Sequence, residues 1–313
     1  MPNFKAERRL GKVVWWNGKF MKPEEANVSI FTHTLHYGMG AFEGIRAYKT
    51  KDGRRAIFKL DEHILRLFES AKIMDLKMPY SFDEVRAATL ETVKQSGLDE
   101  CYIRPLVFIG DGPLGVFPTF EPPIEVAVMT WVWGAYLGAE AKAKGARIKV
   151  SSFSRPHINS QMSKGKIIGH YVNSILAKME AKKSGYDEAL LLDTDGYVAE
   201  GTGENIFMYR RGVLKTTPLP GVLEGLTRDT IMDIAHAQGL EVREERFTRD
   251  EVYTADEAFF CGTAAEVTPI RELDNRTIGN ADGIGPITKR INDAYMAIVR
   301  GEDKSREKLL TYV

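Results

Sequence analysis

Short turn signals between apolar runs recur along this chain and constrain its fold more than any other feature. Asn17-Gly18 separates residues 13–16 from 19–20, and such a pair between apolar runs predicts a two-residue β-hairpin. Asp52-Gly53 and Asp195-Gly196 lie in two further hairpin patterns. Because helical patterns alternate with these hairpins, we expect a mixed α/β (α+β) fold.

Five stretches have helical periodicity, and several of their ends carry capping signals. Segment 81–96 begins with the capping box Ser81-x-x-Glu84, and segment 227–238 has Thr227 as its expected N-cap. The predicted helices are 61–75, 81–96, 171–184, 227–238 and 286–300. The predicted strands beyond the first hairpin are 45–48, 56–58, 102–109, 124–133, 147–153, 188–193, 197–199, 205–209 and 257–261.

The length of the chain indicates more than one domain. Its 313 residues exceed what one hydrophobic core usually holds. Residues 130–145 contain glycines and change from strand-like to small and charged residues. We therefore predict a first domain over 1–131, an interdomain loop over 132–142 and a second domain over 143–313.

Charge and composition disfavour several classes of partner. Lys plus Arg and Asp plus Glu number 43 each, so no net charge favours nucleic acid or an anionic membrane. No run approaches the ~20 apolar residues of a membrane span, and the N-terminus lacks the apolar core of a secretory signal. Two cysteines, Cys101 and Cys261, lie in apolar runs, so we expect buried inert thiols and a cytoplasmic protein.

His33 and His36 have a spacing that zinc could use. No third ligand of a suitable type lies nearby in the sequence. We therefore expect a turn or packing role for this pair, and no metal.

Segment 163–171 places Lys164 and Lys166 before an apolar stretch that contains glycine. A lysine beside apolar walls can have a lowered pKa, as a nucleophilic amine requires. The alternative is two solvated lysines in a loop, and this segment alone favours that alternative. Glu200 lies in a glycine-rich turn, where it is either a partner for a protonated ring nitrogen or an exposed acid.

Two positions suit a bound phosphate. Leu226 and Thr227 stand at an expected helix N-terminus, where free N–H groups and the helix dipole favour an anion. Thr263 follows a predicted strand and adds a hydroxyl. Each signal is weak alone, so the residues indicate only a two-domain protein with several loops able to hold an anionic ligand.

Arg104 stands in the apolar run 102–109. Side chains alternate along a strand, so Tyr102 and Arg104 are expected on the same side. An arginine inside an apolar strand is costly to bury without a partner. From the residues alone, a structural salt bridge and a ligand carboxylate explain Arg104 about equally well.

Read together, eight ordered segments resemble branched-chain amino acid aminotransferases, which belong to the fold-type IV group of enzymes that use pyridoxal 5'-phosphate (PLP). The resemblance runs from about residue 13 to 300. The segments are HTLHYGMGAFEGIRAY (33–48), HILRLFESAK (63–72), YIRPLVFIGDGPLGV (102–116), WGAYLG (133–138), KIIGHYVNSILAKMEA (166–181), GYVAEGTGENIF (196–207), LEGLTRDTI (223–231) and FCGTAAEVTPI (260–270).

The resemblance implies a small N-terminal α/β domain and a larger PLP-binding domain around a β-barrel-like sheet, with PLP between them. The pattern Lys-x-x-Gly-x-Tyr selects Lys166, rather than Lys164, as the catalytic lysine that holds the cofactor. Tyr171 is then implied to bond the cofactor's phenolic oxygen and Glu200 to pair with its pyridine nitrogen. The implied phosphate-binding residues are Arg66, Leu226, Thr227 and Thr263. The implied substrate-binding residues are Tyr37, Phe42, Arg46, Tyr102, Arg104, Trp133, Tyr136 and Ala264.

The activity that the resemblance implies is transfer of the amino group of L-leucine, L-isoleucine or L-valine to 2-oxoglutarate, in ping-pong order. Alternatives with the same fold are a D-amino acid or (R)-amine transaminase, an aminodeoxychorismate lyase, and a non-catalytic PLP-binding protein. The implied partners are small amino acids and 2-keto acids, together with further copies of the chain in a homo-oligomer, dimer or higher. Two departures from the family pattern are His170, where many relatives have Asn, and Glu224, where the pattern has Pro.

Overall fold

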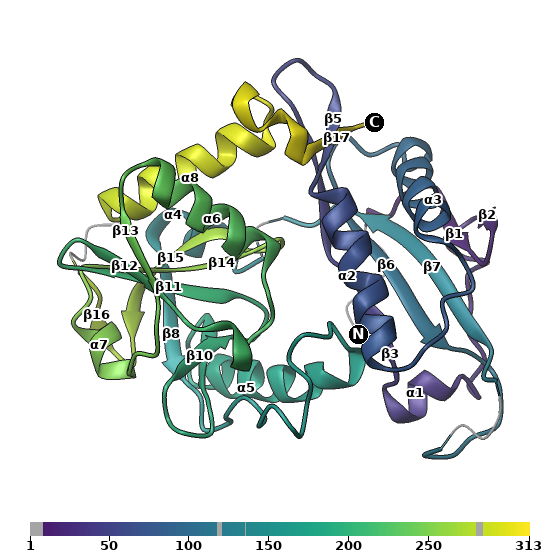
Figure 1. The fold of residues 1–313 in the computed structure, drawn as a ribbon, viewed down its shortest axis with the longest axis horizontal. Coiled ribbons are helices and arrows are strands. Elements are labelled where there is room, and N and C mark those ends of the chain that lie inside the picture. Colours follow the sequence, from purple (N-terminus) through teal and green to yellow (C-terminus); the bar gives the residue numbers. More distant parts are fainter. Residues whose placement is uncertain (1–8, 118–120, 135, 280–283) are drawn as a thin grey trace. The chain divides into compact units, whose positions relative to one another are not determined.

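The computed structural model of the chain describes residues 9–117, 121–134, 136–279 and 284–313 (Figure 1). The chain divides into two compact units. The first comprises the described part of Met1–Trp133 with Gly165–His170 and Ile298–Val313, and the second comprises Gly134–Lys164 and Tyr171–Ala297. The predicted domain bounds stay a prediction, and Ala135 of the predicted interdomain loop lies outside the described residues.

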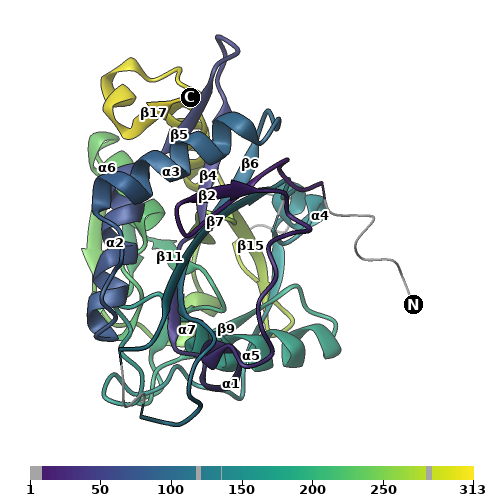
Figure 2. The ribbon, with the colours of Figure 1, turned by 90° about the vertical axis from the view of Figure 1, so that its right-hand side faces the viewer.

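An eight-stranded sheet organises the first unit. Its order is β17-β5-β4-β6-β7-β1-β2, with β3 also paired to β6, and Figure 2 shows β17 beside β5. These pairings are antiparallel. The strands are β1 (Val14–Trp16), β2 (Lys19–Met21), β3 (Gly40–Phe42), β4 (Ile45–Lys49), β5 (Arg55–Phe58), β6 (Cys101–Ile109), β7 (Ile124–Trp131) and β17 (Leu310–Tyr312).

Two helices, α2 (Leu60–Ile73) and α3 (Phe82–Gln95), share a hydrophobic core with this sheet. Leu67 of α2 and Val85 of α3 are fully buried in the same cluster as Ile103 of β6. Burying these apolar helix faces is the main force that attaches α2 and α3 to the sheet. The short helix α1 (His33–Tyr37) and the 3-10 turns at Ile168–His170 and Lys304–Leu309 complete this unit.

A nine-stranded mixed sheet organises the second unit. Its order is β10-β9-β8-β15-β14-β11-β12-β13, with β16 paired to β15, and β8 runs parallel to both β9 and β15. The strands are β8 (Ala146–Val150), β9 (Glu188–Leu192), β10 (Val198–Gly201), β11 (Asn205–Arg210), β12 (Val213–Thr216), β13 (Glu241–Glu244), β14 (Glu257–Gly262), β15 (Glu266–Leu273) and β16 (Arg276–Thr277). The helices are α4 (Ala139–Lys144), α5 (Tyr171–Lys183), α6 (Leu226–Ala237), α7 (Arg249–Tyr253), α8 (Pro286–Val299) and a 3-10 turn at Leu219–Gly221.

The three hairpin turns and the capping box at Ser81 are confirmed. Asn17 and Gly18 both have positive φ, at 44° and 84°, as a two-residue hairpin turn of type I′ requires. The hairpins β4–β5 and β9–β10 are antiparallel as predicted. The Ser81 hydroxyl accepts a hydrogen bond from the Glu84 amide, and the Glu84 carboxylate accepts one from the Ser81 amide.

The predicted N-cap of the helix at 227–238 is wrong by two residues. Helix α6 begins at Leu226, its N-cap is Gly225, and no side chain caps it. Gly225 fits because a Cβ at this position would overlap the side-chain oxygen of Asn205. Thr227 is instead a buried residue of the first turn, only 2% exposed.

Helix α4 overlaps the end of the predicted interdomain loop, 132–142. Its alanine, glutamate and lysine residues are strong helix formers, and Glu140 and Lys144 form an i, i+4 ion pair. The helix-forming residues 139–144 therefore form a short helix, and Gly138 and Gly145 cap its two ends. Several other elements were not predicted: the short elements α1, β3, β12, β13, α7, β16 and β17, and the eight-residue strand β15.

Helix α5 buries small residues rather than large ones. Ser174, Ala177 and Ala181 are buried, whereas Ile175 and Met179 are 54% and 47% exposed. Small side chains allow the helix to pack closely on β9, with which Ala177 and Ala181 share a core cluster.

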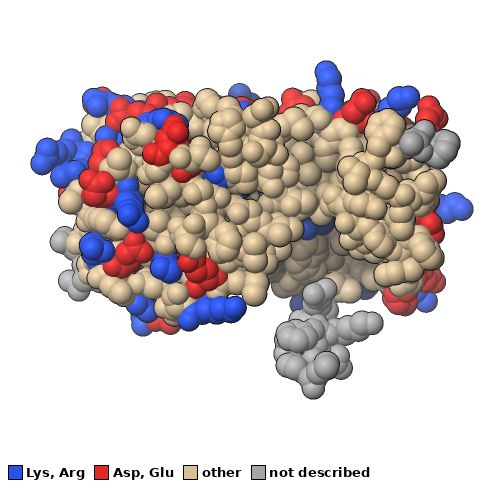
Figure 3. Space-filling view, turned by 90° about the horizontal axis from the view of Figure 1, so that it is seen from below, with Lys and Arg blue, Asp and Glu red and all other residues tan. Residues whose placement is uncertain are grey.

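On the face drawn in Figure 3, acidic and basic side chains are intermixed, mainly toward its edges, and neither sign dominates. Among the described helices, none combines the length and the apolar character that a membrane crossing needs.

Candidate active site

Lys166 is fixed through its backbone in the first unit. Its amide donates to the Ser70 hydroxyl on α2 at 3.0 Å, and its carbonyl accepts from the Phe42 amide at 3.1 Å. The next residue, Ile167, forms a β-bridge with Ala41 of β3. The Lys166 amine lies 5.2 Å from the centre of the Phe42 ring, so this lysine has an aromatic neighbour.

Lys164 has a different environment in the second unit. Its amine donates to the Leu219 carbonyl at 2.7 Å and pairs with the Glu224 carboxylate at 2.8 Å. Both contacts engage the Lys164 amine with acceptor oxygens of the second unit. Glu224, one of the two departures from the family pattern, is therefore a direct partner of the lysine that the sequence analysis set aside.

Arg66 on α2 is held by a carboxylate that the sequence analysis missed. Its Nε and Nη2 atoms donate to the two oxygens of Glu43, at 2.6 and 3.0 Å. His63 Nδ1 lies 2.7 Å from the same carboxylate. Burial by itself would raise the pKa of Glu43, but the charge of Arg66 and the hydrogen bonds from Arg66 and His63 hold that pKa far below its usual range.

Four of the predicted substrate residues gather in the first unit. The Arg104 guanidinium lies 4.2 Å from the Phe42 ring centre and 5.4 Å from that of Tyr102, which confirms that Tyr102 and Arg104 share one side of β6. Trp133 packs edge-on against Tyr102, with ring centres 4.6 Å apart. Arg104 Nε is buried and has no hydrogen-bond acceptor among the residues that the structure describes. The geometry of this atom therefore gives no support to a structural salt bridge, the alternative explanation of this arginine.

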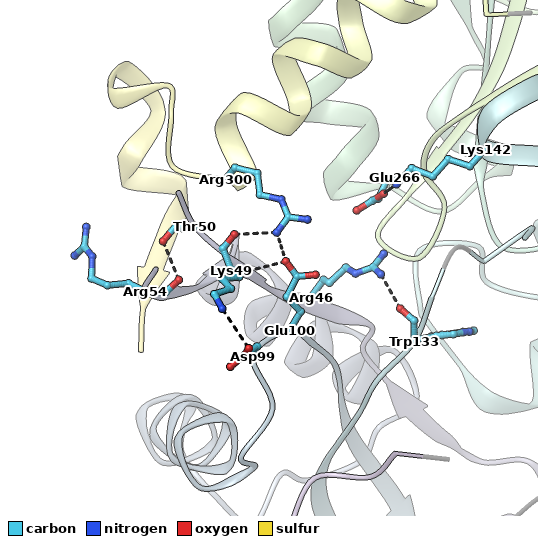
Figure 4. A network of polar contacts seen from close by, with 10 residues as sticks. All are labelled: Arg46, Lys49, Thr50, Arg54, Asp99, Glu100, Trp133, Lys142, Glu266 and Arg300. Atoms are coloured by element: carbon cyan, nitrogen blue, oxygen red, sulfur yellow. Dashed lines mark hydrogen bonds and ion pairs between the residues drawn. The ribbon is translucent and has the colours of Figure 1, made fainter. Parts of the chain in front are cut away.

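Arg46 and Tyr37 are the other predicted substrate residues of this unit. Arg46 Nη2 donates to the Trp133 carbonyl at 2.7 Å, a bond drawn in Figure 4. This bond ties β4 to the segment that follows β7. Tyr37 is the last residue of α1, is 45% exposed, and stacks near His33.

Glu200 is the centre of a polar cluster in the second unit. Its Oε1 lies 3.0 Å from Arg155 Nη2, and its Oε2 accepts from Asn205 Nδ2 at 3.3 Å. Asn205 Nδ2 also lies 3.1 Å from the Leu223 carbonyl, in the loop before α6. Asn205 therefore links the predicted partner of the ring nitrogen to the predicted phosphate loop. Arg155 was missed because it stands far from Glu200 in the sequence.

The remaining predicted residues of this unit lie at the ends of its helices and strands. Leu226 and Thr227 form the first turn of α6, and Tyr171 is the first residue of α5. Thr263 and Ala264 are half-buried in the turn that joins β14 to β15.

Tyr136 lies beside two buried acids that the sequence analysis did not single out. Burial, and then the charges of Glu204 and Glu188, raise the pKa of the Tyr136 hydroxyl. The Lys178 amine lies 5.1 Å from the Tyr136 ring centre and pairs with Glu188. Tyr136 therefore borders a buried charged group of the second unit.

The histidine pair and the cysteines have structural surroundings. His33 Nε2 lies 2.9 Å from the Gly115 carbonyl, and His36 Nε2 lies 2.8 Å from that of Ile30. Among the described residues, no three His, Cys, Asp or Glu side chains are grouped as metal ligands would be. Cys101 and Cys261 are free and buried, and burial raises the pKa of the Cys101 thiol to about 12.

Comparison with known proteins gives a consistent set of relatives. The profile of the family described as amino-transferase class IV matches residues 40–273. A branched-chain-amino-acid aminotransferase of Pseudomonas aeruginosa is 48% identical over 301 residues, which are 96% of this chain and 97% of that protein.

Solved structures agree with the sequence relatives. A branched-chain amino acid aminotransferase from T.th., solved with pyridoxamine 5'-phosphate, has a TM-score of 0.93 at 48% identity, covering 96% of this chain and 98% of that chain. The same enzyme complexed with N-(5'-phosphopyridoxyl)-L-glutamate has a TM-score of 0.92 at 47% identity, with the same coverage. Together these matches confirm the predicted fold class and assign the chain to the class IV aminotransferases, within the branched-chain-amino-acid aminotransferases.

Proposed function

We propose that this enzyme uses PLP to transfer the amino group of L-leucine, L-isoleucine or L-valine to 2-oxoglutarate, giving branched-chain 2-keto acids and L-glutamate in ping-pong order. The observation that carries the proposal is the setting of Lys166. Its amine lies beside the Phe42 ring, and its backbone is fixed by the Ser70 hydroxyl. An aromatic neighbour and a fixed backbone suit a cofactor-binding amine.

The polar groups present fit PLP. The Glu200 carboxylate is held by Arg155 and Asn205, and a carboxylate is the group that a protonated pyridine nitrogen needs. Tyr171 would bond the phenolic oxygen. The phosphate would be held by Arg66, the N–H groups at the start of α6 with Thr227, and the Thr263 hydroxyl. The complex of the T.th. relative with pyridoxamine 5'-phosphate supports this choice of cofactor.

When bound, PLP supplies an electron sink that stabilises negative charge at the substrate Cα. The residues of this chain supply the remaining chemistry. Lys166 would hold the cofactor through its amine, and when released it would take the proton from the substrate Cα as a general base and give it up again as a general acid. The Glu200 carboxylate would favour a protonated ring nitrogen.

The proposed substrate residues suit two kinds of substrate side chain, one branched and apolar and one that ends in a carboxylate. The aromatic side chains of Phe42, Tyr102 and Trp133 offer apolar surface for a branched side chain. The buried Arg104 Nε offers a donor for a second carboxylate, which glutamate and 2-oxoglutarate carry and leucine does not. The complex of a relative with a phosphopyridoxyl adduct of L-glutamate supports glutamate as the dicarboxylic substrate.

A substrate screen tests the proposal. Keto-acid production would be measured with L-Leu, L-Ile, L-Val, L-Phe, D-Ala and (R)-1-phenylethylamine, each with 2-oxoglutarate. We expect the three branched-chain substrates to be used best. Faster turnover of D-Ala or the (R)-amine would favour the transaminase alternatives, and turnover that needs no keto acid would favour a lyase.

We also expect a homo-oligomer, dimer or higher. Four apolar side chains of α5, Val172, Ile175, Leu176 and Met179, are each more than 40% exposed, which supports an association surface. Light scattering of the purified protein would measure its mass, and a monomer at working concentration would refute the expectation. The cytoplasmic location stays a prediction.

A further inference from the structure

Three consecutive residues at the corner between β3 and β4 each contact a residue proposed for cofactor or substrate. The Phe42 amide donates to the Lys166 carbonyl, and the Phe42 ring lies beside the Lys166 amine. The Glu43 carboxylate accepts from Arg66. The Tyr102 hydroxyl lies so close to Gly44 that a Cβ at this position would overlap it, so only glycine fits here.

Glu43 is the most constrained member of this corner. Its side chain is fully buried and accepts from Arg66 Nε, Arg66 Nη2 and His63 Nδ1, at 2.6, 3.0 and 2.7 Å. The Gly44 amide adds a fourth donor at 3.1 Å. A buried carboxylate is costly unless its lone pairs are satisfied, so these four donors define one position for it.

The bidentate contact also defines the orientation of Arg66. Two N–H groups on one edge of a planar guanidinium fix its plane and its rotation. Arg66 stands one helical turn before Ser70, whose hydroxyl accepts from the Lys166 amide. The β3–β4 corner and α2 therefore hold the proposed phosphate arginine and the proposed catalytic lysine in one rigid arrangement.

We propose that Glu43 is a positioning residue, which orients Arg66 toward the cofactor phosphate without touching the cofactor itself. This inference rests on the proposed function. The Glu43–Arg66 pair carries no net charge, so the contribution of Arg66 is an oriented set of donors rather than an excess positive charge. His63 Nδ1 completes the arrangement at 2.7 Å from the same carboxylate. Burial lowers the pKa of His63, against the opposing effect of Glu43.

The test compares PLP with pyridoxal, which lacks the phosphate. The full-length protein, stripped of cofactor, would be titrated with each compound, and binding would be followed by cofactor absorbance. Glu43→Gln should weaken PLP binding by at least about tenfold, as loss of a positioning partner typically does, and leave pyridoxal binding unchanged. Glu69→Gln, an acid of α2 close to Arg66 in sequence, is the matched control and should change neither.

Several results would overturn this role. Equal weakening of PLP and pyridoxal by Glu43→Gln would mean general damage, and unchanged PLP binding would mean that Arg66 needs no such partner. If Glu43→Gln does not fold, Glu43→Asp keeps the buried charge but withdraws it from Arg66 by one methylene, and it should give the same phosphate-specific loss. Full PLP affinity in a folded Glu43→Asp variant would refute the proposal. Failure of the wild-type protein to bind PLP would instead refute the proposed function.

Discussion

The guanidinium of Arg155 lies 3.0 Å from the carboxylate of Glu200, as a largely buried ion pair. The two side chains are 13% and 8% exposed. Asn205 donates to the other oxygen of Glu200. Each oxygen of Glu200 thus has a partner within the protein, and these two contacts hold the carboxylate in one orientation.

Arg155→Met should lower kcat by roughly tenfold to a hundredfold, the usual cost of losing a positioning partner. The reason is that Glu200 loses its counter-charge and its fixed orientation. Steady-state kinetics and the absorbance of the bound cofactor would measure the effect. Arg246→Met, which removes an exposed arginine paired with Asp195, is the control and should be near wild type. An active Arg155→Met enzyme with an unchanged spectrum would contradict this role.

Glu200→Gln should lower kcat by on the order of a hundredfold or more, which corresponds to ~2.7 kcal/mol of barrier. The amide keeps the shape of the side chain but no longer favours a cationic pyridine ring. Arg155 would also lose its partner. Single-turnover spectra with L-leucine would separate this effect from a change in binding. Full activity of the Glu200→Gln enzyme would show that Glu200 is not the partner of the pyridine nitrogen.

Lys166→Ala should abolish both transamination and the long-wavelength absorbance of the bound cofactor. Lys164→Ala is the matched control, two residues away. It removes only a partly exposed ion pair with Glu224 and a bond to the Leu219 carbonyl, so its cost should be ~1 kcal/mol or less. Absorbance and activity would be measured on both variants. If the Lys164 variant is the inactive one, the assigned register of the lysines is wrong.

Arg104→Leu should damage the half-reaction with 2-oxoglutarate far more than that with L-leucine. The buried Nε of Arg104 has no acceptor among the described residues, and only the dicarboxylic substrate brings a second carboxylate to it. The loss of one charge-assisted contact predicts a selective effect of ~1.5–3 kcal/mol. Each half-reaction would be followed separately in single-turnover spectra. Equal losses would indicate a structural role or binding of the carboxylate common to all substrates.

Glu204 should make folding stability fall as the pH rises. Burial, and then the neighbouring charge of Glu188, raise the pKa of Glu204 well above its usual value, against the opposing effect of Lys178. A raised pKa in the folded state means that the stabilising contribution is complete below the unfolded pKa and is lost as the pH rises through the folded one. The expected loss is about 1.4 kcal/mol per pH unit within that window.

Glu204→Gln is neutral at every pH and should flatten this dependence. The other titratable groups that face Glu204 are Lys178 on α5, Glu188 on β9, Tyr136 and Cys261. Thermal unfolding of the variant and the wild type would be compared at increasing pH, starting below the usual pKa of a glutamate and rising through the acidic and neutral range. Parallel curves of Tm against pH would show that another group is responsible.

Features that depend on neighbouring residues could be read from the sequence. The hairpin at Asn17-Gly18 was predictable because positive φ at two adjacent positions is a local requirement. The capping box at Ser81 was predictable because both of its partners lie within one helical turn. The choice of Lys166 over Lys164 depended on motif spacing, and the roles of both lysines await the experiments above.

The sequence by itself determined the longer helices, the hairpins, the fold family and the set of residues worth testing. Only the tertiary structure decided which buried charges face each other. Glu43 meets Arg66 because β3 and α2 pack side by side. Arg155 meets Glu200 because its backbone bonds to Leu192 at the end of β9, and β9 pairs with β10. No local pattern encodes such pairs, because a buried charge is stabilised by whichever opposite charge the fold brings within hydrogen-bond distance.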